Sequence, residues 1–355
     1  MGWHLGQLGR YDSALAAYDQ ALRISPQSAY GRVGRGLSLL HLKRYQEAVD
    51  DLKRSFRLQP AFEKNAKYME ALAHSYNQLG QTERAFETYF AGERLEPQRF
   101  EFVYGAGWAL LSLEQYEKAE TQLRRAVSLE PKNANAAYDL ARALYYLKKL
   151  EESREILRTV AKLDPNRVDT HIAMGMAFRD EHKFRDAEFA FKRAIQIEPT
   201  SSEAYIQLSV TYAEDKRWED ALAAARKMAE LLPSDEYTYL SIAAACQELT
   251  RYAEQIEACN SALHLNPASL PALEGLAYAY SGMDKYAESA DAVKRALELK
   301  PDAPYLHAWL SQAYTELGRP EQAEAELKVL ETLDRQLAAD VRKIISENKS
   351  IAGLH

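Results

Sequence analysis

The stretch from Phe100 to Pro131 reads FEFVYGAGWALLSLEQYEKAETQLRRAVSLEP. Two sets of apolar or small residues in it recur every three or four positions, which is the spacing of one face of an α-helix. The first set is Val103, Ala106, Gly107, Leu110 and Leu113, and the second is Tyr116, Ala119, Leu123, Ala126 and Val127. Glu114-Gln115 separates the sets, and Pro131 ends the second because proline cannot continue a helix. The stretch therefore predicts two antiparallel helices with small residues where they cross.

The same unit returns along the whole chain. A proline closes most copies of it, at Pro26, Pro60, Pro97, Pro131, Pro165, Pro199, Pro233, Pro267 and Pro301. Successive prolines in this series are 34 residues apart, except that Pro60 and Pro97 are 37 apart. A constant period of this size is typical of a tandem array in which each unit packs on its neighbours.

This pattern resembles that of the tetratricopeptide repeat (TPR) family, whose unit is a 34-residue helix–turn–helix. The small residue of the first helix is Gly36, Ala73, Gly107, Ala141, Gly175, Ser209, Ala243, Ala277 or Ser311. The small residue of the second helix is Ala14, Ala48, Ala85, Ala119, Ala187, Ala221 or Ala323, replaced by Ser153, Gln255 and Ser289 in three units. The resemblance implies an all-α fold, a right-handed superhelix of stacked helix pairs. It implies no particular chemistry, because the family shares a scaffold rather than an activity.

The register divides the chain into ten units and a C-terminal segment. The units lie near residues 1–28, 29–62, 66–99, 100–133, 134–167, 168–201, 202–235, 236–269, 270–303 and 304–335, and residues 336–355 are expected to form a capping helix and a tail. Gly2 falls on the small-residue position of the first unit, so the start of that unit is missing. We therefore expect that the chain is a piece of a longer array or that its start is mis-assigned.

Local signals refine these boundaries. The three extra residues between Pro60 and Pro97 predict a longer loop or an extra turn before the third unit, or a local change in superhelix curvature. Polar residues that favour the first position of a helix precede several first helices. The N-caps predicted in this way are Asn133, Ser201, Ser234 and Ser269.

Composition and motifs exclude several classes of function. The chain has 45 Lys and Arg against 52 Asp and Glu, a net charge of -7, and its basic residues are scattered, so nucleic acid is not an expected partner. It has no run of 18 apolar residues and no secretory signal, which predicts no membrane insertion and favours the cytoplasm. The eight histidines show no metal-ligand spacing, and no catalytic motif is present. We expect no enzyme activity, no cofactor and no metal.

Binding is the remaining class of function. In proteins that this chain resembles, first helices line the concave side of the superhelix, and their positions 2, 5, 6, 9, 12 and 13 point inward. Several of these positions hold aromatic or arginine side chains that helix stacking does not require, and such residues are enriched at interface hot spots. The predicted binding residues are Tyr104, Trp108, Leu111, Tyr138, Arg142, Tyr145, Tyr146, Ile172, Met176 and Arg179. Later units add Tyr237, Leu240, Tyr278, Tyr305 and Trp309 at equivalent positions.

These residues predict a scaffold that binds an apolar or amphipathic segment of a partner protein. The set with which some TPR domains grip a C-terminal carboxylate is absent, since Lys67 is followed by Glu70, Ala71 and His74. Two other interpretations stay open. The chain could be the targeting arm of a larger enzyme whose catalytic domain lies outside it, or a scaffold that self-associates through its open N-terminal unit.

Overall fold

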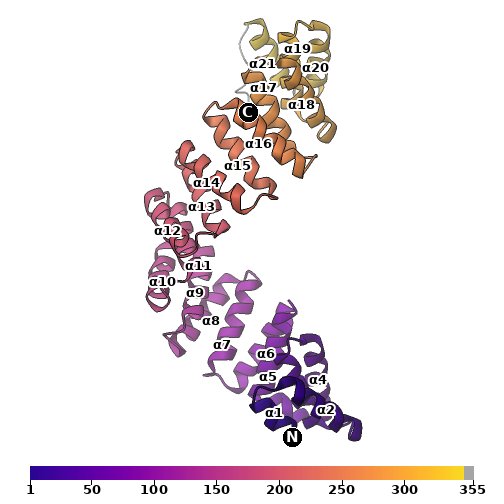
Figure 1. Cartoon of the computed structure of the whole chain (residues 1–355), viewed down its shortest axis with the longest axis vertical. Coiled ribbons are helices and arrows are strands. Elements are labelled where there is room, and N and C mark those ends of the chain that lie inside the picture. Colours follow the sequence, from indigo (N-terminus) through magenta and orange to yellow (C-terminus); the bar gives the residue numbers. More distant parts are fainter. Residues whose placement is uncertain (348–355) are drawn as a thin grey trace. The chain divides into compact units, whose positions relative to one another are not determined.

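The computed structural model describes residues 1–347, which form α-helices and one 3₁₀ turn and contain no strand (Figure 1). The all-α prediction is confirmed. The first compact unit, Met1–Ala177, holds α1 (Gly2–Gln7), α2 (Tyr11–Ile24), α3 (Ala29–His41), α4 (Tyr45–Leu58), η1 (Pro60–Lys64), α5 (Ala66–Gln78), α6 (Thr82–Leu95), α7 (Phe100–Ser112), α8 (Tyr116–Leu129), α9 (Ala134–Tyr146), α10 (Leu150–Leu163) and most of α11 (Val168–Asp180).

The second compact unit starts at Phe178, near the end of α11. Its helices are α12 (Phe184–Ile197), α13 (Ser202–Glu214), α14 (Trp218–Leu231), α15 (Glu236–Glu248), α16 (Tyr252–Leu265), α17 (Leu270–Gly282), α18 (Tyr286–Leu299), α19 (Pro304–Glu316), α20 (Pro320–Leu333) and α21 (Arg335–Ser346). Successive helices pack on each other from α1 to α10 in the first unit and from α12 to α21 in the second, and first helices of adjacent repeats, such as α5 and α7 or α15 and α17, also touch.

Small residues let the two helices of a repeat approach closely. A Cβ atom added at Gly107 of α7 would lie 2.9 Å from the Cγ of Leu123 on α8. Where serine replaces glycine or alanine, its hydroxyl donates to a carbonyl of the facing helix. These bonds run from Ser153 to Ala141 (2.7 Å), from Ser209 to Ala221 (3.2 Å), from Ser289 to Ala277 (2.9 Å) and from Ser311 to Ala323 (3.1 Å). The serine substitutions therefore keep the crossing close and leave no hydroxyl unsatisfied.

The turn inside each described helix pair contains one residue with a positive φ angle. Glycine fills this position at Gly9, Gly80 and Gly318, and other residues fill it at Lys43, Glu114, Lys148, His182, Lys216, Thr250 and Asp284. A left-handed residue here ends the first helix by turning its last carbonyls toward backbone N–H groups. At Thr250, for example, the N–H of Arg251 donates to the carbonyl of Cys246 at 2.9 Å.

The helix starts agree with three of the four predicted N-caps. Asn133, Ser201 and Ser269 each accept a hydrogen bond from the backbone N–H three residues later. The prediction for Ser234 is wrong, because α15 begins one residue further on and Asp235 caps it, accepting from Thr238 at 2.9 Å. Ionised aspartate is the stronger acceptor for the positive end of a helix.

Two further segments complete the fold. The insertion before the third repeat forms the extra turn η1, in which Phe62 is buried. At the C-terminal end, Asp334 caps α21, whose Ala338 and Val341 pack with Leu327 and Leu330 of α20. The predicted tail from Ile351 to His355 lies outside the described residues.

Thr250→Gly should stabilise the protein. Threonine is β-branched and has a φ of 54° here, a conformation that costs a non-glycine residue roughly 1–2 kcal/mol. Glycine relieves this strain but is more flexible in the unfolded chain, so the free energy of unfolding should rise by about 1 kcal/mol. Urea unfolding followed by circular dichroism measures the change. The reverse substitution Gly318→Thr, at the same position of another repeat, should destabilise; a loss of stability in Thr250→Gly would contradict the prediction.

Candidate functional site

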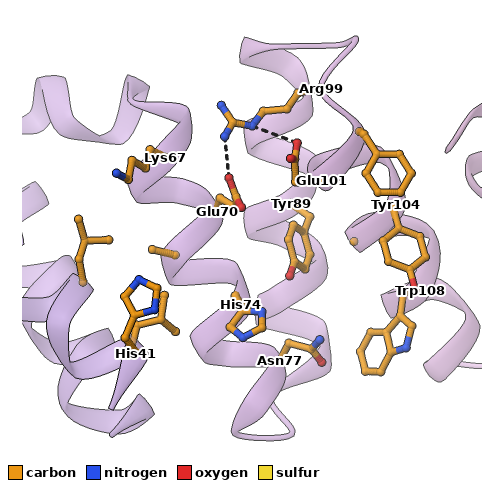
Figure 2. Close-up of a pocket in the computed structure, with 15 residues that line it drawn as sticks. His41, Lys67, Glu70, His74, Asn77, Tyr89, Arg99, Glu101, Tyr104 and Trp108 are labelled. Atoms are coloured by element: carbon orange, nitrogen blue, oxygen red, sulfur yellow. Dashed lines mark hydrogen bonds and ion pairs between the residues drawn. The ribbon is translucent and has the colours of Figure 1, made fainter. Parts of the chain in front are cut away.

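A groove of about 640 Å³ lies on the first helices of the second, third and fourth repeats, all in the first compact unit (Figure 2). Its walls come mainly from α3, α5 and α7, with contributions from α6 and from the turn that precedes α7. The lining residues are Leu37, Leu40, His41, Lys67, Glu70, Ala71, His74, Asn77, Tyr89, Arg99, Phe100, Glu101, Tyr104, Gly105 and Trp108.

The helix period explains why these residues share one side. On α5, Met69, Leu72 and Tyr76 are buried in the core of the first unit. Lys67, Glu70, Ala71, His74 and Asn77 occupy positions 2, 5, 6, 9 and 12 of the same helix and line the groove. Most of these positions are therefore not used to hold the repeats together, and their side chains can be chosen for another purpose.

An ion-pair cluster lies near the N-terminal ends of α5 and α7. Arg99 donates a hydrogen bond to Glu70 at 2.7 Å, and its guanidinium lies 3.4 Å from the carboxylate of Glu101 (Figure 2). A third carboxylate, Glu96, lies 3.2 Å from Arg99. These pairs are partly exposed, so each adds little stability. They do hold the two groove-lining carboxylates next to a positive charge.

One edge of the groove is basic. His41 of α3 stacks on Tyr11, with the two ring centres 4.1 Å apart. Lys67 and His74 project from α5 beside His41 (Figure 2). Burial, and then the nearby Lys67 and His74, lower the pKa of His41. Lys67 is exposed and forms no ion pair with any described residue. This edge therefore offers the positive charge of Lys67 and imidazole N–H groups to an anionic group.

The opposite side of the groove is aromatic and contains two of the predicted binding residues, Tyr104 and Trp108. The Tyr104 hydroxyl donates to the buried carboxylate of Asp139 at 2.8 Å, and its ring stacks on Phe100 at 5.3 Å. Asp139 also accepts a hydrogen bond from Arg142 at 3.1 Å. Burial raises the pKa of Asp139 despite these partners. Tyr104 is thus fixed by the next repeat, whereas Trp108 is half-buried at the groove.

The prediction for Leu111 is wrong. Its side chain is 4% exposed and belongs to the core cluster that includes Leu140 and Leu144 of α9. The same position on α5 holds Asn77, which does line the groove. On α7, the adjacent helix α9 covers this position, so Leu111 holds two repeats together and offers no binding surface.

Other predicted rings contact their own chain and lie outside this groove. The guanidinium of Arg167 lies 4.2 Å from the centre of the Tyr138 ring. Tyr146 stacks on Tyr116, with ring centres 4.7 Å apart, and meets Tyr145 edge-on, with ring centres 5.6 Å apart. Tyr146 is nevertheless 48% exposed, so it retains surface for a partner.

The last three predicted residues lie on α11. Ile172 and Met176 are half-buried in the first unit. Arg179 belongs to the second unit, where it donates a hydrogen bond to Gln207 and lies 3.8 Å from the carboxylate of Glu214. A single aromatic groove across the fourth, fifth and sixth repeats therefore stays a prediction; the described groove contains only its first two members.

The predicted binding residues include none of the charged or polar residues of the groove other than Tyr104 and Trp108, and among those left out are His41, Lys67, His74 and Asn77. All four occupy the inward positions identified in the sequence, but in the second and third repeats rather than the fourth to sixth. The search for aromatic and arginine side chains passed over them. Applying the same positions to every repeat would have found them.

No group of three or more His, Cys, Asp or Glu side chains in the part of the chain that the structure describes is arranged to hold a metal ion. No helix within residues 1–347 is long and apolar enough to cross a membrane.

Comparison with known proteins identifies the class to which this fold belongs. Tetratricopeptide repeat families match residues 110–177, 178–245 and 282–345, and also residues 1–61. The chain therefore belongs to the tetratricopeptide repeat family, as the resemblance in the sequence implied.

Individual relatives match over part of this chain. One relative is the inactive TPR repeat-containing thioredoxin TTL3 of Arabidopsis thaliana, to which this chain is 34% identical over 85 residues. The matched stretch is 24% of this chain and 12% of that protein. Among solved structures, the C-terminal part of a TPR repeat-containing protein of Cytophaga hutchinsonii has a TM-score of 0.55 at 17% identity and covers 68% of this chain and 98% of its own. PilF of Pseudomonas aeruginosa has a TM-score of 0.50 at 16% identity over 59% of this chain and 95% of its own. These likenesses support the fold.

Tyr104→Phe should destabilise the first unit although it keeps the ring. The substitution removes the hydroxyl that donates to the buried carboxylate of Asp139, and a buried acceptor that loses its donor costs about 1–3 kcal/mol. Urea unfolding measures the loss. Tyr138→Phe is the matched control, because no described residue bonds to its hydroxyl, and it should change the free energy of unfolding much less. Equal losses in the two variants would show that the Tyr104 hydroxyl carries no structural role.

Replacing Lys67 should move the titration of His41. Because the folded state lowers the pKa of His41 below its ordinary value of about 6.5, the unfolded chain binds this proton more tightly, and stability should fall as the pH drops through that value. Lys67→Gln removes one of the causes, so the NMR titration midpoint of the His41 ring should rise. Lys118→Gln, on the exposed face of α8, is the control and should leave the midpoint unchanged. A midpoint insensitive to Lys67→Gln would refute the proximity of the two charges.

Proposed function

We propose that this chain is a non-enzymatic scaffold that binds a segment of a partner protein in the groove on α3, α5 and α7. Repeat arrays of this family present extended surfaces that suit such binding. The observation that carries the proposal is the composition of the groove. Lys67, His74 and Trp108 line it from positions that the packing of the repeats does not need, and all three keep exposed surface.

The two sides of the groove favour an amphipathic segment. Tyr104 and Trp108 supply a rigid aromatic surface that suits an apolar side chain, and tryptophan is among the residues that most often dominate binding energy. Lys67 and the two histidines supply positive charge and N–H donors that suit a carboxylate. The segment that fits best therefore carries an acidic group near one end and an apolar side chain near the other.

The double substitution Lys67→Ala with Trp108→Ala should abolish capture of the partner without unfolding the protein. Each residue is partly exposed, so its truncation removes groove surface and little core. Loss of an aromatic hot spot together with a charged contact should lower the affinity tenfold or more. Each tenfold decrease in affinity corresponds to about 1.4 kcal/mol of binding free energy. Affinity purification from an extract of the source cells, with quantitative mass spectrometry, measures the amount of each captured protein.

The matched control is Phe90→Ala with Lys118→Ala. These substitutions also remove one aromatic ring and one ammonium group, but from α6 and α8, where Phe90 is 45% exposed and Lys118 is exposed, and neither residue lines the groove. Circular dichroism melting should be similar for both double variants and for the wild type. Capture that falls equally in both double variants, or in neither, would place the binding surface elsewhere.

A further inference from the structure

A second groove, also of about 640 Å³, lies on α15, α17 and α19 of the second compact unit. Its walls include Leu240 and Gln247 of α15, Glu274 and Tyr278 of α17, and Tyr305 and Trp309 of α19. These residues occupy most of the same repeat positions as those of the first groove. Its charge differs, because Glu274 is the one charged side chain among the described residues that line it, whereas the first groove holds both cations and carboxylates.

Glu274 is held by a neutral donor and by no cation. The Tyr305 hydroxyl donates a hydrogen bond to the Oε1 of Glu274, and no basic side chain of the described residues forms an ion pair with this carboxylate. Burial and the bond to Glu274 raise the pKa of Tyr305 to about 12, so the hydroxyl keeps its proton at neutral pH. A half-buried carboxylate with a single neutral donor favours a positive group beside it.

Aromatic rings surround this carboxylate. Tyr305 and Trp309 meet edge-on with their centres 5.8 Å apart, and Tyr278 meets Tyr252 edge-on at 6.2 Å. Lys300 lies 5.9 Å from the Tyr305 ring but does not line the groove. The faces of tyrosine and tryptophan attract cations, and they also pack on the aliphatic stems of lysine and arginine.

A buried amide adds a polar anchor. Gln255 occupies the position that alanine fills in most repeats, is 0% exposed and lines this groove. Its Nε2 donates to the carbonyl of Gly275 at 3.1 Å and to the Oε1 of Gln247 at 3.0 Å. A carbonyl oxygen only accepts hydrogen bonds, so the amide atom of Gln255 that faces Gly275 is the nitrogen Nε2. The other amide atom of Gln255, Oε1, accepts no hydrogen bond from any described residue. A buried acceptor without a donor is destabilising by itself and suits an N–H of a bound segment.

We propose that the groove on α15, α17 and α19 binds a lysine or arginine side chain of a partner segment. Its cationic group lies beside Glu274 and against the rings of Tyr278 and Trp309, and a backbone N–H of the same segment donates to Gln255. This inference rests on the proposed function, because it gives the chemistry of one segment that the scaffold binds. It uses different residues in the other compact unit, so each can fail alone.

A random heptapeptide library displayed on phage tests the proposal against the full chain. Peptides selected on the wild type should be enriched in lysine and arginine, and their capture should decrease with added salt. Glu274→Gln keeps the shape and the bond from Tyr305 but removes the charge, so capture of the basic peptides should fall about tenfold. Glu257→Gln is the matched control, since Glu257 is exposed on α16, outside the groove, and it should leave capture unchanged.

A second variant separates the amide from the charge. Gln255→Ala restores the residue that most repeats have, so the fold should persist; capture should weaken while the preference for basic peptides remains. Three outcomes would each overturn the inference. The peptides selected on Glu274→Gln could contain as much lysine and arginine as those selected on the wild type. The wild type could also select peptides without enrichment of lysine and arginine, or capture no peptide. Peptides that are lost on the double variant of Lys67 and Trp108, but kept on Glu274→Gln, report the first groove and test the proposed function independently.

Discussion

The close crossing of the two helices in each repeat is the constraint on which the rest of the structure depends. At Gly107 the backbone of α7 comes so near to Leu123 that a single added carbon would touch it, and the serines at equivalent positions bridge the gap with hydrogen bonds to the facing helix. The residues that make this close contact lie on one side of each first helix, next to the turn with the left-handed residue. Most positions on the opposite side are not needed for this packing, so their residues vary between repeats without changing the fold.

That freedom explains how one chain carries two grooves whose charged groups differ. The groove on α3, α5 and α7 is basic at the edge formed by His41, Lys67 and His74, whereas the groove on α15, α17 and α19 has a single carboxylate among aromatic rings. Both are built from nearly the same repeat positions, and each lies within one compact unit. On the proposed function, a few side chains set the identity of the bound segment, and the scaffold contributes their spacing.

The period of the prolines was enough to predict the helix pairs, because each repeat obeys the same local rules. The sequence did not reveal that residues such as Thr250 adopt positive φ angles, since the neighbouring repeats impose that turn on a residue which disfavours it. It also did not separate Leu111, covered by α9, from Asn77, which occupies the same position and faces the groove. Contacts between repeats, such as that between Tyr104 and Asp139, join residues 35 apart and have no signature in local periodicity.

One tyrosine in each groove is already hydrogen-bonded to an adjacent repeat. Tyr104 donates to Asp139 of the next repeat, and Tyr305 donates to Glu274 of the preceding one. Each bond fixes a ring that would otherwise sample several rotamers, so a partner need not order it on binding, and ordering such a side chain costs about 0.5–1.5 kcal/mol. Because of the same bond, the tyrosine also contributes to the stability of the fold. Rings that the repeats hold in this way pre-form the walls, and the affinity for a segment then depends on what these bonds leave available: Trp108 and Lys67 in the first groove, and the charge of Glu274 in the second.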